Sequence, residues 1–349
     1  MSPYRVGIIG CGRRPENPGP MGYGMGHAHA RGYEASPDAE IVALADIVLE
    51  NARLFQGEHG GDALYEDYHE MLAEEDLDIV SVTTWPHLHA EMVIAAAEAG
   101  VKAIHCEKPM APTFGEARRM LEVCEANGVQ LTFNHQRRFA PVFQTARRLV
   151  DEGAIGQLQT LHGVCGNLYD WGTHWFDMLN YLNDECDIAW VLGQVDLRGS
   201  TRIFGAPVEG QGLAYYAYKN GTYGMLTTGH GMPSGAWIEL IGSDGRIEIG
   251  RDRDEPLRAW AKGDADWHTV PVEGGLHGED YIVAAILDLI DALKTGREPM
   301  LSGRRALRAT ELIFAAYESS RRCGRVDLPL EIEDSPLVDM MAEKGMEPA

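Results

Sequence analysis

The first 134 residues alternate between short apolar runs and segments of helical character, and this alternation limits the possible folds more than any other feature. The apolar runs lie at residues 4–9, 41–46, 77–84, 101–105 and 129–133. Helices are predicted to begin at residue 24 and to cover 65–73, 89–99 and 114–127. Strands that alternate with helices at this spacing predict a parallel, doubly wound sheet, which is an α/β fold.

The first apolar run ends in Gly10-Cys11-Gly12, a pattern typical of a phosphate-binding turn. Glycine allows the sharp bend, and the missing Cβ lets a pyrophosphate approach the backbone. We interpret Gly26 as the third glycine of this pattern, displaced along the chain. The alternative is a plain glycine-rich loop.

The segment Arg13 to Tyr23 separates these glycines and is too rich in proline and glycine to be helical. It reads as an insertion in the turn. Either it flanks the cofactor, with Arg13 or Arg14 near phosphate, or it is a surface loop, which we favour.

Asp46 ends the second apolar run, where an acidic residue accepts hydrogen bonds from both ribose hydroxyls and repels a ribose phosphate. No arginine follows it, so the sequence favours NAD over NADP. The alternative is that Asp46 only caps the next helix.

The third apolar run ends at Thr84-Trp85-Pro86, and Trp85 and Pro86 are suited to form an apolar wall beside a nicotinamide ring. We expect these three residues and His89 near the cofactor. His87 and His89 are more typical of a loop and a helix start than of catalysts.

The fourth run leads into Cys106-Glu107-Lys108-Pro109. A lysine at the carboxyl end of a buried strand lies where open α/β sheets bind their ligands, and the proline forces a turn there. The alternative is a solvated loop lysine.

From residue 155 the chain changes to short runs of alternating apolar and polar residues, which predict an open, mostly antiparallel sheet. Asn220-Gly221 and Asp244-Gly245 predict hairpins. Helices are predicted over 139–152, 278–294 and 303–321, before an acidic tail that reads as a loose arm. We therefore predict domains at 1–134, for the cofactor, and 135–330, for substrate and oligomerisation, with a tail at 331–349.

Asp170 and His174 lie four residues apart at the start of a predicted helix and therefore share a face. A histidine beside a carboxylate is a suitable general base near neutral pH. The alternative is that Asp170 is an N-cap and His174 a buried histidine with satisfied hydrogen bonds. Trp171 and Trp175 are suited either to stack on a sugar or to fill the core.

Charge excludes several classes of partner. The chain has 53 acidic and 30 basic residues, a formal charge of -23, which repels nucleic acid and anionic membranes. No apolar run is long enough to span a bilayer, and the amino terminus lacks the features of a signal peptide. The six cysteines show no disulfide or zinc spacing. These features predict a cytoplasmic protein with reduced thiols and no metal.

Glu107-Lys108-Pro109 and the pair Asp170 and His174 together resemble motifs of the glucose-fructose oxidoreductase / inositol dehydrogenase / MocA (Gfo/Idh/MocA) family. The resemblance runs from about residue 5 to residue 330. It implies an amino-terminal Rossmann domain and a carboxyl-terminal α/β domain whose open sheet often forms oligomers, here a homodimer or homotetramer. The lysine of that motif contacts substrate and nicotinamide in the family, which maps to Lys108. The insertion after Gly12 departs from the family pattern and affects the expected phosphate contacts.

These features predict an NAD-dependent dehydrogenase that oxidises a secondary alcohol of a sugar or cyclitol. Lys108, Asp170 and His174 are the expected catalytic residues. Cofactor contacts are expected from Gly10, Gly12, Gly26, Asp46, Thr84, Trp85, Pro86, His89, Glu107 and Lys108. Substrate contacts are expected from Lys108, Arg137, Tyr169, Asp170, Trp171 and His174. Two alternatives remain open: a redox-neutral glycosidase with tightly held NAD, and a non-catalytic dinucleotide sensor or scaffold.

Overall fold

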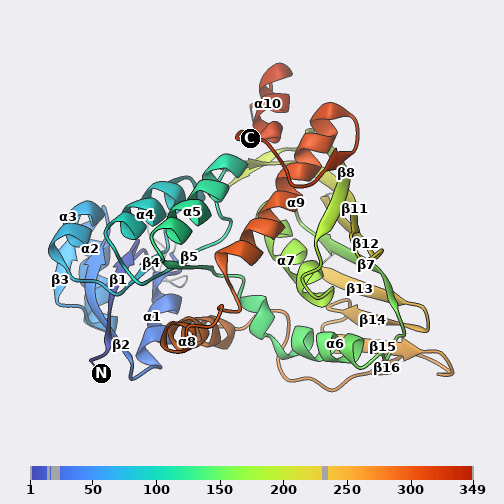
Figure 1. Ribbon diagram of the computed structural model, residues 1–349, viewed down its shortest axis with the longest axis horizontal. Coiled ribbons are helices and arrows are strands. Elements are labelled where there is room, and N and C mark those ends of the chain that lie inside the picture. Colours follow the sequence, from blue (N-terminus) through green and yellow to red (C-terminus); the bar gives the residue numbers. More distant parts are fainter. Residues whose placement is uncertain (1, 14–15, 17–23, 230–234, 348–349) are drawn as a thin grey trace. The chain divides into compact units, whose positions relative to one another are not determined.

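The computed structural model describes residues 2–13, 16, 24–229 and 235–347 (Figure 1), and by its contacts the chain divides into two compact units. The first unit contains Met1–Pro112, Glu116–Gln136 and Glu279–Leu307. The second contains Thr113–Gly115, Arg137–Gly278 and Arg308–Ala349. The first unit is thus completed by a segment from late in the chain. The assignment of residues 1–134 to the cofactor and of residues 135–330 to substrate and oligomerisation stays a prediction.

The first unit is built on a parallel sheet, which confirms the predicted doubly wound α/β fold. Among the described residues the sheet has six strands in the order β3-β2-β1-β4-β5-β6. The strands are β1 (Tyr4–Ile9), β2 (Ala39–Ala45), β3 (Ala63–Tyr65), β4 (Ile79–Val82), β5 (Ala103–Cys106) and β6 (Gln130–Phe133). The order reverses between β1 and β4, and ligands of such sheets bind at the carboxyl ends beside this reversal.

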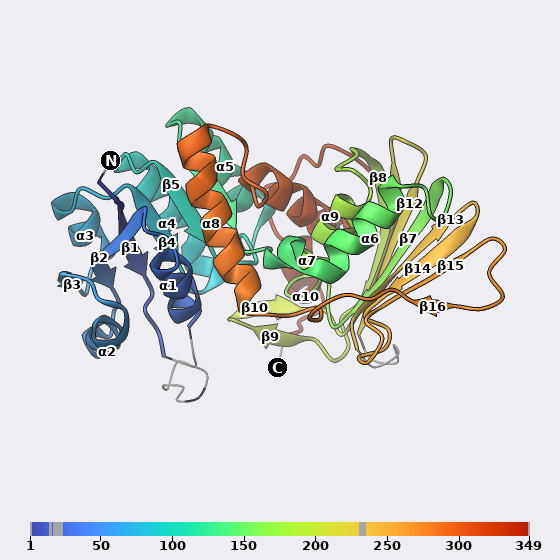
Figure 2. The same ribbon diagram turned by 90° about the horizontal axis from the view of Figure 1, so that it is seen from below.

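Helices cover both faces of this sheet. The helices are α1 (Gly26–Glu34), α2 (Leu49–His59), α3 (Tyr68–Glu74), α4 (Pro86–Glu98), α5 (Phe114–Ala126) and α8 (Asp280–Thr295). One buried cluster joins side chains of α1, α2 and α8 to β1 and β2, and the other joins α3, α4 and α5 to the opposite face. Figure 2 shows α8 beside α1, and a Cβ at Gly32 of α1 would lie 2.6 Å from the Cβ of Ile286. The helix interior needs a glycine there because the two helices approach so closely.

Three local predictions in this unit are corrected. Tyr65 belongs to β3, and the helix predicted from 65 begins at Tyr68. The helix predicted from His89 begins at Pro86, where proline suits the first helical position. Helix α2 was not predicted, because only Ala52 and Phe55 among its residues are fully buried and its apolar stripe is correspondingly weak.

The second unit is built on an open, mostly antiparallel sheet, as predicted. Among the described residues it has nine strands in the order β16-β15-β14-β13-β7-β12-β11-β8-β17. The strands are β7 (Leu158–Cys165), β8 (Ile188–Asp196), β11 (Gln211–Tyr218), β12 (Tyr223–Gly229), β13 (Trp237–Gly242), β14 (Gly245–Ile249), β15 (Leu257–Ala261), β16 (His268–Thr269) and β17 (Val326–Asp327). Neighbouring strands pair antiparallel except β7 and β12. Both predicted hairpins, β11–β12 and β13–β14, are present. A small ribbon pairs β9 (Thr201–Ile203) with β10 (Ala206–Val208).

One face of this sheet is covered by helices (Figure 2). The helical elements assigned largely to this unit are η1 (Gln136–Phe139), α6 (Pro141–Asp151), α7 (Gly172–Leu182), α9 (Gly303–Arg322) and α10 (Pro336–Glu343). Of these, α10 lies against the ribbon strand β10. The predicted stripe of α7 is buried, since Phe176, Leu179 and Leu182 are at most 1 % exposed. Helix α7 contacts β7 and β12, so its first turn is fixed against the centre of the sheet.

The carboxyl-terminal segment is not a loose arm over its described part. Residues 336–343 form α10, and its Leu337 and Met341 are buried. Arg321 of α9 also pairs with Asp334 and Asp339. Buried leucine and methionine side chains hold the tail more firmly than its acidic composition suggested.

All six cysteines are free thiols, four of them buried. No helix of the described residues combines the length and the apolar character needed to cross a bilayer.

Candidate active site

The glycine-rich turn after β1 has the backbone that the sequence predicted. Gly10 and Gly12 have φ of +90° and +63°, which favour glycine. A Cβ on Gly26 would lie 3.0 Å from the carbonyl oxygens of both Gly10 and Cys11. The third glycine of a dinucleotide fingerprint permits this close helix–strand packing, so Gly26 fills that position despite the intervening residues.

The insertion begins and ends at one point. A Cβ on Gly12 would lie 2.8 Å from the Cα of Gly24, and the Gly24 amide donates to the Arg13 carbonyl over 3.0 Å. The Arg13 side chain donates to Asn51 over 2.7 Å. Residues 14, 15 and 17–23, including Arg14, lie outside the described residues.

Asp46 lies beside this turn at the end of β2. One carboxylate oxygen accepts the Gly12 amide over 2.9 Å. The other accepts the Val48 amide over 2.9 Å and the Asn51 side chain over 3.2 Å. Asp46 therefore ties the start of α2 to the glycine turn. The N-cap residue of α2 is Val48, without a side-chain cap bond, and the contact of Asp46 with a ribose stays a prediction.

The turn after β4 faces the same edge of the sheet. The Thr83 hydroxyl donates to the Gly10 carbonyl over 2.5 Å, which joins β4 to β1 at the reversal of strand order. Thr84 and Trp85 are half-buried, and Pro86 is buried as the first residue of α4. These residues lie at the carboxyl edge of the sheet. Their predicted contact with a nicotinamide ring stays a prediction.

His89 is fully buried and both of its ring nitrogens have partners within the protein. Nδ1 lies 3.0 Å from the Pro109 carbonyl and Nε2 lies 3.1 Å from the Thr84 carbonyl. Burial lowers the pKa of this imidazole. His89 thus connects the turns after β4 and β5. Its predicted cofactor contact stays a prediction.

Lys108 follows β5, where its preceding residue Glu107 is held by several donors. Glu107 accepts from His29 over 3.0 Å and from Asn134 over 2.7 Å, and it also accepts the Lys108 amide. Burial alone would raise the pKa of Glu107, but the hydrogen bonds from His29 and Asn134 and the Lys108 charge lower it to about 2. The carboxylate is therefore ionised, and it fixes the backbone that carries Lys108.

A buried hydrogen-bond chain supports Glu107 from behind. The Tyr33 hydroxyl lies 2.8 Å from Ser81 Oγ, and Ser81 Oγ lies 3.1 Å from His29 Nδ1. One assignment satisfies each link: Tyr33 donates to Ser81, Ser81 donates to His29, and His29 Nε2–H donates to Glu107. Sequence reasoning missed His29 and Ser81, because a polar residue inside an apolar strand or helix carries no local sign of its partner.

In the second unit, a short turn positions Asp170 and His174. The Asn167 side chain accepts the Asp170 amide over 2.6 Å, and the His174 amide donates to the Trp171 carbonyl over 3.1 Å. The first residue of α7 is Gly172, with Trp171 at the N-cap position and no side-chain cap. Asp170 is half-buried and His174 is 4 % exposed. The N-cap alternative for Asp170 is therefore wrong.

Glu209, which sequence reasoning did not single out, supports this turn. Its carboxylate accepts the Leu168 amide over 2.6 Å, the Thr228 hydroxyl over 2.9 Å and the Tyr317 hydroxyl over 2.7 Å. Burial raises its pKa despite these donors. The available signal was an acidic residue two positions before β11.

Two adjacent buried arginines differ in their partners. Arg138 pairs with Asp177 of α7 over 2.7 Å and also with Glu185. Arg137 is 4 % exposed, and its Nη2 lies 3.1 Å from His277 Nδ1. The Nε and Nη1 groups of Arg137 have no hydrogen-bond partner among the described residues. Burial lowers the pKa of Arg137 to about 10, while Asp170 opposes this. These donors suit an oxygen-rich ligand.

The aromatic residues near Arg137 have different roles. Trp175 is fully buried and its indole N–H donates to the Trp237 carbonyl, so it belongs to the core. Trp171 is half-buried and packs on Trp175 and His277. The Arg137 guanidinium lies 5.4 Å from the Trp171 ring. Tyr169 is 3 % exposed. Arg137, Asp170 and Trp171 therefore form one connected group within the second unit.

Comparison with known proteins matches both units to one family. Residues 4–135 match "Oxidoreductase family, NAD-binding Rossmann fold" (GFO_IDH_MocA) and residues 161–328 match "Oxidoreductase family, C-terminal alpha/beta domain" (GFO_IDH_MocA_C). The chain belongs to the GFO_IDH_MocA family. This confirms the resemblance, the fold and the NAD-binding character predicted from the sequence.

Individual GFO_IDH_MocA relatives align along nearly the whole chain. The D-apiose dehydrogenase of Paraburkholderia graminis is 28% identical, covering 96% of this chain and 92% of that protein. The myo-inositol 2-dehydrogenase of Thermotoga maritima is 26% identical, covering 90% and 96%. The structure of levoglucosan dehydrogenase with NADH and L-sorbose shares the fold with a TM-score of 0.79, at 23% identity, covering 95% of this chain and 100% of that chain.

The residues at the carboxyl edge of the parallel sheet fit the dinucleotide that defines the family. No Cβ projects from Gly10, Gly12 or Gly26, so a pyrophosphate can approach the backbone closely there, and α1 begins at Gly26. Asp46 follows β2 directly, where a ribose binds in such sheets.

Proposed function

We propose that this chain is an NAD-dependent dehydrogenase that oxidises a secondary alcohol group of a sugar, sugar derivative or cyclitol. The observation that carries the proposal is the position of Lys108 at the carboxyl edge of the parallel sheet, where the ionised Glu107 accepts its backbone amide. This sheet lies in the part of the chain that matches the NAD-binding Rossmann fold of the family. Relatives named as apiose, inositol and levoglucosan dehydrogenases support the substrate class.

Within this proposal His174 takes the proton of the alcohol, as a histidine general base does near neutral pH. Asp170 orients the imidazole and stabilises its charged form. Lys108 donates to the alcohol oxygen and stabilises the charge that develops there. When bound, NAD supplies the acceptor for the hydride that leaves the alcohol carbon.

The second unit supplies the proposed substrate contacts. The Nε and Nη1 nitrogens of Arg137, which have no hydrogen-bond partner among the described residues, are suited to donate to hydroxyl or carboxylate oxygens of a polyhydroxylated substrate. Trp171 presents a half-buried ring beside Arg137, which suits the apolar face of a sugar. Tyr169 completes the set of proposed substrate residues.

The test is NADH formation, followed by absorbance, on a panel of sugars, cyclitols and glycosides. With the best substrate, Lys108→Ala is expected to lower kcat about 10²–10³-fold. His174→Ala is expected to lower kcat about 10²–10⁴-fold. The Kd for NAD should stay nearly unchanged in both variants, because neither side chain is proposed to bind its phosphates or ribose.

Lys102→Ala is the matched control, since Lys102 precedes β5 at the opposite end of the strand and is 60% exposed. Near-normal turnover of the Lys108 and His174 variants would contradict the assigned roles. A cleaved glycoside with no net NADH would instead identify the redox-neutral glycosidase, and tight NAD binding without turnover would favour a sensor.

A further inference from the structure

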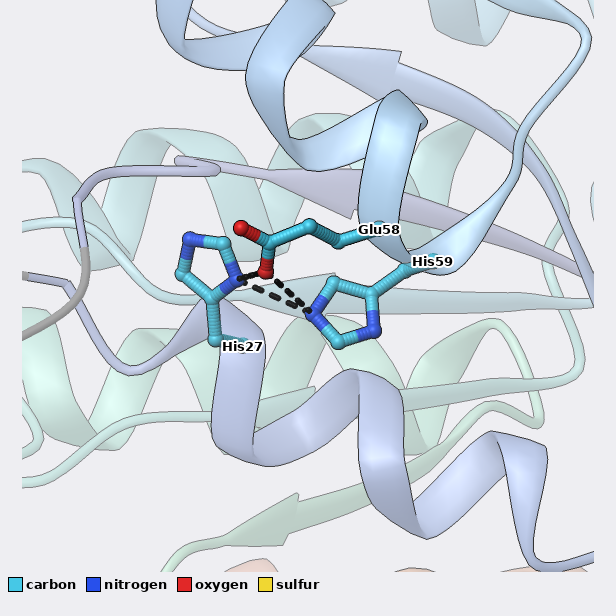
Figure 3. A group of neighbouring side chains, drawn as sticks. All are labelled: His27, Glu58 and His59. Atoms are coloured by element: carbon cyan, nitrogen blue, oxygen red, sulfur yellow. Dashed lines mark hydrogen bonds and ion pairs between the residues drawn. The ribbon is translucent and has the colours of Figure 1, made fainter.

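Three side chains with metal-binding atoms converge in the first unit, and none of them is among the catalytic residues discussed above. His27 is the second residue of α1, and Glu58 and His59 are the last two residues of α2. Figure 3 shows their tips facing one another. The atoms His27 Nδ1, His59 Nε2 and one oxygen of Glu58 all lie within 4.8 Å of one another.

The spacing of these atoms suits a tetrahedral ion. His27 Nδ1 lies 2.9 Å from His59 Nε2 and 3.4 Å from Glu58 Oε2, and His59 Nε2 lies 3.7 Å from the same oxygen. Zinc binds histidine nitrogen and carboxylate oxygen at about 2.0–2.2 Å, which places tetrahedral ligand atoms roughly 3.3 Å apart. The three separations lie on both sides of this value. Two histidines and one glutamate are also a known zinc ligand set.

A fourth residue orients His59 in the manner of a metal ligand. His59 Nδ1 lies 2.6 Å from Glu34 Oε1. Because the carboxylate accepts the Nδ1 proton, the lone pair of a neutral His59 lies on Nε2 and is directed at the cluster. His27 Nδ1 then faces two acceptors, His59 Nε2 and the Glu58 carboxylate. A cation at the centre would satisfy all three.

The surroundings hold the two imidazoles in place. The ring of Phe55, which is fully buried, lies 4.8 Å from the His27 ring and 4.7 Å from the His59 ring. His27 is 6% exposed and the His59 side chain 4%, whereas the Glu58 side chain is 40% exposed. The imidazoles are therefore preorganised, and solvent reaches the cluster on the side of Glu58 to supply a water as the fourth ligand.

We propose that His27, Glu58 and His59 bind one divalent transition-metal ion, with zinc as the ion that the ligand set favours. Nitrogen ligands disfavour magnesium and calcium, which prefer oxygen. The ion joins the start of α1 to the end of α2. Its ligand His27 directly follows Gly26, so the bound ion stabilises the first turn of the helix that begins at this glycine. The sequence predicted no metal because its ligands stand 32 residues apart, outside short-spacing motifs.

The full chain, produced without a histidine tag and stripped with a chelator, is titrated with Zn²⁺ against a chromophoric competitor. We expect one ion per chain. At roughly 100-fold excess of free Zn²⁺ over Kd, the melting temperature should rise by several degrees, because the ion binds the folded state. Co²⁺ should give the intense visible absorption of a tetrahedral site, without a thiolate-to-metal charge-transfer band. Such a charge-transfer band would show that the ion binds at cysteine and would overturn the assignment.

Variants locate the ion. His27→Ala and His59→Ala should abolish uptake, and Glu34→Gln, which keeps all three ligands, should weaken affinity about 10–100-fold. The control is His69→Ala, an exposed histidine of α3 outside the cluster, which should bind as the unchanged chain does. If a ligand variant fails to fold, the melting temperatures of the unchanged chain with and without Zn²⁺ decide the question. No uptake by the unchanged chain, or equal uptake by a folded His59→Ala variant, overturns the proposal and leaves a direct hydrogen bond between the two imidazoles.

Discussion

Arg137 and Arg138 are adjacent and both almost fully buried, yet they have different electrostatic partners. Burial alone would lower the pKa of Arg138, but Asp177 and Glu185 raise it above its ordinary value. Among the described residues Arg137 has a hydrogen-bond partner in His277 and no carboxylate partner at hydrogen-bond distance, and burial lowers its pKa. The sequence shows two identical residues and cannot separate them, because the difference depends on residues about 40 to 140 positions away. The contrast makes Arg137 the better candidate for a ligand.

The pKa of Glu107 predicts an acid sensitivity. Its pKa in the folded chain is about 2, below the ordinary value of 4.5. A carboxylate of this kind stabilises the fold above its ordinary pKa and loses that contribution as pH falls from about 4.5 to about 2. We expect the contribution to be about 3 kcal/mol. Denaturant unfolding across this pH range should therefore show Glu107→Gln converging on the unchanged chain as pH falls.

Glu66→Gln is the control for this prediction, because Glu66 is exposed in the same unit. It should follow the unchanged chain at every pH. Parallel curves for Glu107→Gln and the unchanged chain would show that Glu107 does not provide the acid-sensitive stability.

At the scale of elements, the ion pair between Arg138 and Asp177 holds η1 to α7. Both side chains are 1% exposed. Removing one partner leaves a buried charge, so Arg138→Met or Asp177→Asn should lower the free energy of unfolding by about 3–5 kcal/mol. Thermal or denaturant unfolding measures this. Because α7 also carries His174, activity should fall with stability.

Arg148→Met provides the comparison, since Arg148 and Glu152 form an exposed pair on α6 with side chains 58% and 56% exposed. Loss of such a pair should cost only about 0–1 kcal/mol. Equal costs at the buried and the exposed pair would contradict the argument.

Most elements were predictable because local pattern determines them. Apart from β3, β15, β16 and β17, which were not predicted, the strands of both sheets follow from apolar periodicity, and the glycine turn and both hairpins follow from turn residues. Helix α10 had usable signals in Pro336 at its first position and in the i, i+4 spacing of Leu337 and Met341, but the acidic composition obscured them. Helix α8 was found, but its packing on α1 was not, because Gly32 and Ile286 are distant in sequence. The motif residues of the candidate site were predicted from the sequence. The residues that support them through hydrogen bonds, such as His29 and Glu209, were missed.

At the scale of the whole molecule, the outer face of the second unit's sheet predicts self-association. Leu192, Leu213 and Tyr223 are 47%, 39% and 41% exposed on three neighbouring strands, and the Tyr215 ring stacks on Tyr223 at 5.6 Å. Apolar faces of this kind are uncommon on soluble monomers, and we expect a second copy of the chain to cover this one. Leu213→Glu should place a charge in that interface and reduce the mass measured by sedimentation.

The control is Leu287→Glu, which changes an equally exposed leucine, 39%, on α8 of the other unit. It should sediment as the unchanged chain does. A monomeric unchanged chain, or an assembly that survives Leu213→Glu, would show that this face is not the interface.

The pairing of the Gly24 amide with the Arg13 carbonyl, and the contact of Gly24 with Gly12, give the ten residues numbered 14–23 a shared point of departure and return. The number of residues between 13 and 24 therefore does not determine the geometry of the glycine turn. Closing a loop twice as long costs only about 0.6 kcal/mol in chain entropy. The sequence between residues 13 and 24 can therefore change in length during evolution without a change in the glycine turn or in the fold.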